Sequence, residues 1–126
     1  MVGQAIPPAR PVVLVVEDEP IQRMDAIDII EDLGFEAVQA TDAADAVRIL
    51  EARPDIRVVF TDIDIPNGID GMKLAAAIRE RWPPIEIIIV SGRRIPRPND
   101  IPERGVFFPK PYKRDAIAST LRQMVS

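Results

Sequence analysis

With 126 residues, 47% of them hydrophobic, the chain has the size and composition of one compact globular domain. Its 16 basic and 20 acidic residues leave a net charge of -4, which argues against a general nucleic-acid-binding protein. It contains neither cysteine nor histidine, so disulfide scaffolds, thiolate zinc sites, cysteine nucleophiles and histidine bases are excluded. Any chemistry must therefore use carboxylates, hydroxyls, lysine or a hard metal ion.

The sequence carries no sign of a membrane or secretory segment. Its longest apolar runs are far shorter than the roughly 20 residues that span a bilayer. The N-terminus also lacks the basic start and apolar stretch of a signal peptide. We therefore expect a cytoplasmic protein that binds neither membrane nor nucleic acid. Residues 1–10, which include Gly3, Pro7 and Pro8, predict a short flexible leader before one domain at 11–126.

The domain opens with a strand and a helix. Val12–Val16 is apolar at every position, as expected for a strand buried on both faces of a parallel sheet. A helix follows from Pro20, after the acidic Glu19, and Gly34 ends it. The stripe that we predict to be buried consists of Ile21, Met24, Ile27, Ile30 and Leu33.

The same alternation repeats along the chain. Further strands are predicted at 35–40, 58–61, 85–90 and 106–108. Three more helices are expected: one capped by Thr41 or Asp42 and ending before Pro54, one carrying Leu74, Ile78 and Trp82, and a last one carrying Ile117, Leu121 and Met124. This pattern predicts an α/β fold of three layers, a flavodoxin-like (βα)5 unit whose parallel five-stranded sheet has the order 2-1-3-4-5.

One connection departs from the alternation. Residues 92–105 contain three prolines, which leave the fourth helix short or missing. The segment has four arginines against Asp100 and Glu103, a local balance of +2. This basic face suggests an acidic protein partner.

Carboxylates follow two strands that are neighbours in this topology. Glu17, Asp18 and Glu19 follow the first strand, and Asp62 ends the third, with Asp64 two residues on. The carboxyl ends of these strands flank the crevice where such folds bind ligands. Carboxylates gathered there repel one another, and a hard cation such as Mg²⁺ relieves the repulsion. For any single acid, a solvated strand end is the alternative interpretation.

Five features in order resemble the receiver domain of two-component response regulators, over residues 12–125. These features are the acidic pair Glu17-Asp18, Asp62 at the end of the third strand, the loop from Pro66 to Gly71, the hydroxyl of Ser91 followed by Gly92, and Lys110-Pro111 after the fifth strand. The loop after Pro66 is one residue longer than the commonest pattern, and Phe107 lacks the hydroxyl of the tyrosine found in many receivers.

The resemblance implies a phosphoacceptor. Asp62 would take a phosphoryl group from the histidine of a partner, either a histidine kinase or a histidine phosphotransfer protein. Mg²⁺ would be held by Asp18, Asp62 and the backbone carbonyl of Asp64, with Glu17 acting mostly through water. Lys110 would supply a fixed positive charge.

The resemblance also implies a switch. The hydroxyl of Ser91 would turn to the new phosphoryl group, and the aromatic ring of Phe107 would follow it inward. The Lys110-Pro111 bond is expected to be cis. Since no effector domain fits after the last helix, we expect a stand-alone receiver, monomeric or weakly dimeric. It would catalyse only its own phosphorylation from small donors and its own dephosphorylation, and would signal by protein contact or drain phosphoryl groups from a kinase.

Three alternatives stay open at this point. Asp62 and Asp64 also resemble the aspartate pair of haloacid-dehalogenase-type phosphatases, in which the second aspartate is a general acid. Glu17 with the same pair resembles the metal site of Toprim domains, which leaves Ser91 and Lys110 unused. The third alternative is a degenerate receiver that is never phosphorylated.

Overall fold

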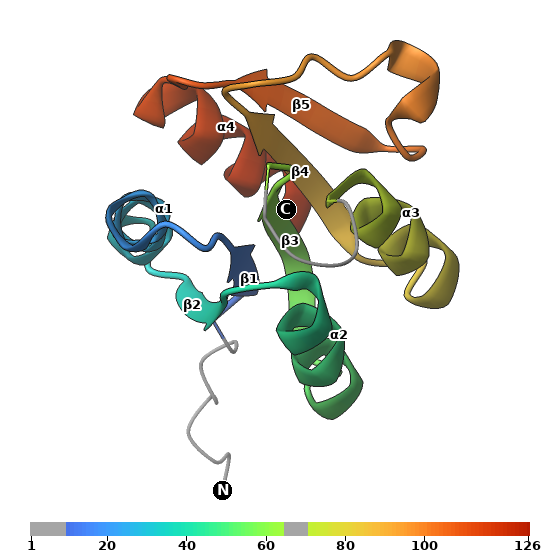
Figure 1. Ribbon diagram of the computed structural model, residues 1–126. Helices are drawn as coiled ribbons and strands as arrows, with labels where there is room; N and C mark the ends of the chain where they lie inside the picture. Colours follow the sequence, from blue (N-terminus) through green and yellow to red (C-terminus); the bar gives the residue numbers. More distant parts are fainter. Residues whose placement is uncertain (1–9, 65–70) are drawn as a thin grey trace, which may run out of the picture.

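A computed structural model describes residues 10–64 and 71–126 of the chain. Five strands form one parallel sheet in the order β2-β1-β3-β4-β5, with helices on both faces (Figure 1). The strands are β1 (Val12–Val16), β2 (Glu36–Ala40), β3 (Ile56–Asp62), β4 (Glu86–Ser91) and β5 (Gly105–Pro109). The helices are α1 (Pro20–Asp32), α2 (Ala43–Ala52), α3 (Gly71–Arg81) and α4 (Arg114–Val125). The predicted fold class and strand order are confirmed.

Two hydrophobic layers enclose the sheet because successive side chains of a strand point to opposite faces. From β1, Val13 and Val15 join the layer beneath α1 and α4, whereas Leu14 joins the layer beneath α2 and α3. All five residues of β1 are buried, as its unbroken apolar sequence predicts. The three central strands are thus fixed by packing on both sides, and their carboxyl ends form a rigid platform.

The connection between β4 and β5 contains only a short 3₁₀ helix, η1 (Pro98–Asp100). The prediction that the fourth helix is short or missing is confirmed. Proline removes a hydrogen-bond donor and clashes with the preceding turn, so this stretch does not extend into an α-helix. Most of its side chains are exposed, including that of Ile95.

The buried face of α1 corrects the predicted stripe. Ile21 and Met24 are 70% and 67% exposed, while Ala26, Ile29 and Ile30 are buried. Residues three apart drift by about 60° per step around an α-helix, so a row of such residues winds off the packed face. By this rotation Ile21 lies on the side of the helix opposite Ile30.

The ends of the helices follow the sequence closely. The Glu19 carboxylate accepts hydrogen bonds from the backbone N–H groups of the first turn of α1, and Asp42 caps α2 in the same way. Gly34 follows α1 with a positive φ of 81°. Of the predicted leader, residues 1–9 lie outside the described residues, as do residues 66–70 of the loop that leads into α3. Within the described ranges, no helix is long and apolar enough to cross a membrane.

Candidate functional site

The ends of four strands bring the predicted site residues together. In the sheet, Val16 of β1 lies level with Thr61, and Asp62 of β3 lies level with Val90. Glu17 and Asp62 therefore emerge side by side at the carboxyl edge of the sheet. Ser91 ends β4 and accepts a 2.9 Å hydrogen bond from the backbone N–H of Lys110 through its carbonyl, so the lysine emerges at the same edge.

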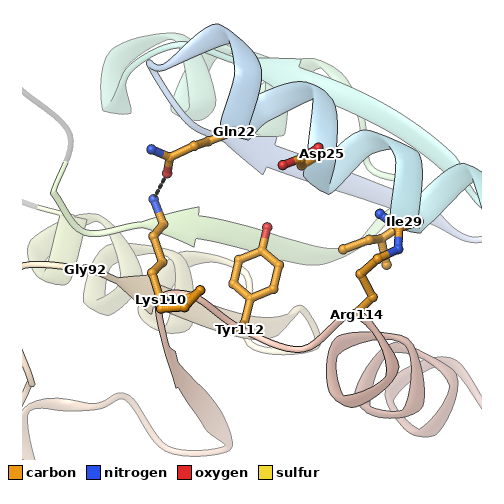
Figure 2. A pocket seen from close by; sticks show the side chains of 8 residues that line it. Gln22, Asp25, Ile29, Gly92, Lys110, Tyr112 and Arg114 are labelled. Atoms are coloured by element: carbon orange, nitrogen blue, oxygen red, sulfur yellow. Dashed lines mark hydrogen bonds between the residues drawn. The ribbon is translucent and has the colours of Figure 1, made fainter.

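Lys110 contacts three other side chains at this edge of the sheet. Its Nζ donates to Oδ2 of Asp62 at 2.6 Å and to Oε1 of Glu17 at 3.0 Å, and also to Oε1 of Gln22. Figure 2 shows the lysine side chain pointing toward Gln22 on α1. Burial alone would lower the pKa of Lys110, but the two carboxylates outweigh it and raise that pKa. The Lys110-Pro111 bond is cis, as expected.

Glu17 is the most perturbed acid of the site. It is 3% exposed, and burial raises its pKa from 4.5 to about 7. The hydrogen bond from Lys110 opposes this rise, and the neighbouring charge of Asp62 adds to it. Two buried carboxylates thus share one ammonium group, which leaves negative charge at this edge incompletely compensated.

Asp62 is held in one orientation from both sides. Its Oδ1 accepts a 2.7 Å hydrogen bond from the backbone N–H of Asp64, and its Oδ2 receives the Lys110 ammonium. The side chain faces a cavity of about 220 Å³, which Glu17 and the exposed Asp18 also line. A second cavity of about 570 Å³ lies alongside, between α1 and the segment after β5 (Figure 2). Asp62 is therefore fixed at the wall of an accessible space.

The two predicted switch residues have different surroundings. The Ser91 hydroxyl is buried and donates to Oδ2 of Asp64 at 2.9 Å. Phe107 is half-buried, lies level with Ile89 of β4 and packs against the layer beneath α2 and α3. Its position in the core is the ordinary one for an aromatic residue on a strand.

Two contributors to the site are missing from the sequence-based prediction. Gln22 contacts Lys110, and the Asp64 side chain accepts hydrogen bonds from several donors, whereas the receiver interpretation gives a role only to the Asp64 carbonyl. The signal for Gln22 was its place in the first turn of α1, which starts directly after the acidic strand end. For Asp64 the partners lie 27 to 29 residues away, so no local pattern indicates them.

The donor chemistry of the site fits a hard cation. Oxygen ligands from carboxylates and a backbone carbonyl are those that Mg²⁺ prefers. Across residues 10–64 and 71–126, no three acidic side chains converge closely enough to hold a metal by themselves. The set formed by Glu17, Asp18, Asp62 and the carbonyl of Asp64 would therefore depend on the main chain as well. The uncompensated charge at Glu17 is the observation that favours a cation here.

The sequence matches the response regulator receiver domain family over residues 13–122, and the chain belongs to this family. It is 29% identical over 121 residues to the sensor kinase CckA of Brucella abortus, covering 90% of this chain and 12% of that protein. It is 33% identical over 117 residues to the hydrogenase transcriptional regulatory protein HoxA of Cupriavidus necator, covering 90% of this chain and 24% of that protein. The chain thus spans a quarter or less of these relatives.

Solved structures agree with the family assignment. A response regulator receiver protein from Pseudomonas putida matches with a TM-score of 0.82 and 29% identity, over 91% of this chain and 98% of that one. Receiver domains are regulatory phosphoacceptors of two-component signalling and generally use Mg²⁺ at the phosphorylation site. This family assignment gives no support to the phosphatase alternative.

Proposed function

We propose that Asp62 accepts the phosphoryl group, and that the donor is a phosphohistidine of a histidine kinase or a histidine phosphotransfer protein. The observation that carries the proposal is the fixed Asp62 carboxylate, bound to the Lys110 ammonium at the wall of a cavity. These 126 residues contain no histidine, so the phosphohistidine donor lies outside them. The rest of the site serves to position the group and to balance charge.

The transfer itself is a substitution at phosphorus. An oxygen of the Asp62 carboxylate attacks the phosphorus atom, and the phosphorus–nitrogen bond of the donor breaks. The electron pair of that bond stays on the imidazole nitrogen. The imidazole leaves as a neutral ring if its other nitrogen already carries a proton, and otherwise takes up a proton at the leaving nitrogen. The product is an acyl phosphate. Phosphoryl transfer needs mainly positioning and charge neutralisation, which Lys110 supplies from a rigid strand end. Its raised pKa keeps the ammonium charged at neutral pH.

Glu17, Asp18, Asp62 and the carbonyl of Asp64 would hold Mg²⁺. The bound ion supplies positive charge to the oxygens of the transferred group. Glu17 contributes an acid whose charge is costly without a cation, because burial raises its pKa to about 7. Asp18 is exposed and lines the same cavity as Asp62.

Ser91 and Phe107 form the proposed switch. In the state described, the Ser91 hydroxyl donates to Asp64 and not to Asp62. Rotation toward a phosphoryl oxygen would leave space behind the hydroxyl, and we propose that the half-buried ring of Phe107, which lies level with Ile89 on the neighbouring strand, moves into it. The output would be a change at β4, β5 and the basic 92–105 segment, passed to a protein partner or used only to drain phosphoryl groups from a kinase.

The phosphatase alternative is not favoured by the geometry. It needs Asp64 as a general acid, yet burial of this carboxyl is outweighed by hydrogen bonds from Ser91, Arg93 and Gly92, which lower its pKa. A carboxylate stabilised in its charged form is a poor proton donor. We propose a cytoplasmic receiver comprising residues 11–126, monomeric or weakly dimeric, with no activity beyond its own phosphorylation and dephosphorylation.

The experiment that tests the proposal is phosphorylation with acetyl phosphate and with a phosphorylated histidine kinase, in Mg²⁺. The wild-type protein should form an acid-stable, base-labile adduct, and Asp62→Asn should form none. Asp28→Asn, on the exposed face of α1, is the matched control and should behave as wild type. An adduct that persists in Asp62→Asn would overturn the assignment, and turnover of unrelated phosphomonoesters would support the phosphatase.

A further inference from the structure

One carboxylate ties the end of β3 to the segment that follows β4. Oδ2 of Asp64 accepts hydrogen bonds from the Ser91 hydroxyl at 2.9 Å and from the backbone N–H groups of Gly92 and Arg93 at 3.1 Å each. Its Oδ1 lies 3.6 Å from Nε of Arg94. The Asp64 side chain is only 12% exposed. Four donors from four consecutive residues therefore surround one carboxylate.

The segment is folded around this anion. The Ser91 oxygen, besides donating to Asp64, accepts hydrogen bonds from the backbone N–H groups of Arg94 at 2.9 Å and Arg93 at 3.3 Å. Arg94 adds a 2.6 Å hydrogen bond from Nη2 to the carbonyl of Ile63, and the first regular element of this connection is the three-residue η1. The Asp64 carboxylate thus helps to fix the conformation of 91–94, together with the Ser91 hydroxyl and the contact between Arg94 and Ile63.

The donors that Asp64 occupies are those that a phosphoryl group would need. A hydroxyl, backbone N–H groups and an arginine are typical partners of phosphate oxygens. Asp64 lies two residues from Asp62, and both line the same cavity with Gly92 and Arg93. A phosphoryl group on Asp62 would bring nearly two negative charges to this cavity. It would repel the Asp64 carboxylate and compete for the same donors.

We propose that the Asp64 carboxylate is an anchor of the resting state, which stands in for the phosphoryl group and is displaced when Asp62 is phosphorylated. The displacement rests on the proposed function of Asp62. The anchor makes residues 91–94 the first part of the chain to respond to the phosphoryl group. Asp64 is then a positioning residue: it acts through Ser91 and the two loop amides. The rearranged segment includes Arg93 and Arg94, two arginines of the basic 92–105 face, where a partner would sense the change.

The test compares backbone amide signals and hydrogen exchange in wild type, Asp64→Ala and Asp64→Asn, each with and without Mg²⁺ and the phosphoryl mimic beryllofluoride. In the resting state, the Gly92 and Arg93 amides of Asp64→Ala should exchange at least about tenfold faster than in wild type, because each loses a hydrogen bond to a charged acceptor. Asp64→Asn keeps an acceptor oxygen and should show a smaller effect. Asp100→Asn, exposed in the same segment, is the control and should match wild type.

With the mimic bound, the wild-type and Asp64→Ala signals of residues 91–94 should converge, because the carboxylate no longer holds the segment. Unchanged exchange at Gly92 and Arg93 in resting Asp64→Ala would overturn the anchor. A difference that stays as large with the mimic bound as without it would overturn the displacement. If the wild-type signals around Lys110 do not respond to the mimic at all, the proposed function fails along with the displacement, and the resting-state comparison alone then decides the anchor. The remaining amide signals report whether each variant is folded.

Discussion

The buried acid Glu17 is expected to make the stability of the metal-free protein depend on pH. Its pKa is raised from 4.5 to about 7, chiefly by burial. The folded protein therefore holds the Glu17 proton more tightly than the unfolded chain does. The resulting stability is fully present below about pH 4.5 and is lost as the pH rises through about 7. At about 1.4 kcal/mol per pKa unit, the whole loss is on the order of 3 kcal/mol, of which about 2 kcal/mol falls between pH 5.5 and 7.5.

The sequence makes this effect measurable. The chain has no histidine, and ordinary carboxyl groups titrate near pH 4, so few other groups change charge between pH 5.5 and 7.5. The assay is urea unfolding in EDTA across this range, for wild type and Glu17→Gln. The free energy of unfolding should fall for wild type and stay nearly flat for the variant. Glu31→Gln, exposed on α1, is the control and should follow wild type. Equal slopes for wild type and Glu17→Gln would refute the reasoning.

Three further predictions concern the same edge of the sheet. Lys110→Met should destabilise the metal-free protein in urea unfolding at pH 8, because two buried carboxylates lose their cation. The loss should be at most about 3 kcal/mol, since the Lys110 side chain is 18% exposed. It should be smaller at pH 5, where Glu17 is protonated. Gly71→Ala should cost about 1–3 kcal/mol by the same assay, since an added Cβ would lie 2.3 Å from Cα of Ile63 and the backbone must shift; a neutral result would show that α3 has room there. Mg²⁺ should raise the thermal unfolding midpoint of wild type and of Glu19→Gln but not of Asp18→Asn, because the Glu19 carboxylate caps α1. If both variants lose the Mg²⁺-induced rise to the same extent, that geometry is contradicted.

The fold was predictable because its strongest signals are local. The unbroken apolar β1 indicates a strand covered on both faces, and the regular alternation of strands and helices dictates parallel crossovers. The prolines after β4 likewise predict that no full helix forms between β4 and β5. The prediction of the buried face of α1 was wrong because that face depends on contacts distant in the sequence. Ile21 and Met24 match a three-residue spacing, but which side of a helix is buried depends on how it docks, and here these two side chains are exposed.

The candidate site was predictable as far as topology could determine it. Strand order alone brings Glu17 and Asp62 together, and Lys110 between two prolines marks the end of β5. What topology cannot give is the direction of a side chain at a loop. The Asp64 carboxylate turns to residues 91–93, far along the chain, and Gln22 reaches Lys110 across the gap between α1 and β5. Both contacts arise only when the elements are assembled in three dimensions.

The most direct test of the account is the chemical identification of the phosphorylated residue. Borohydride reduces an aspartyl phosphate to homoserine, and peptide mass spectrometry then locates that residue in the protein. After treatment with acetyl phosphate and Mg²⁺, we predict homoserine at position 62 and nowhere else. Homoserine in place of Asp18 or Asp64, or no homoserine in a protein that has taken up phosphate, would contradict the assignment of Asp62 as the phosphoacceptor.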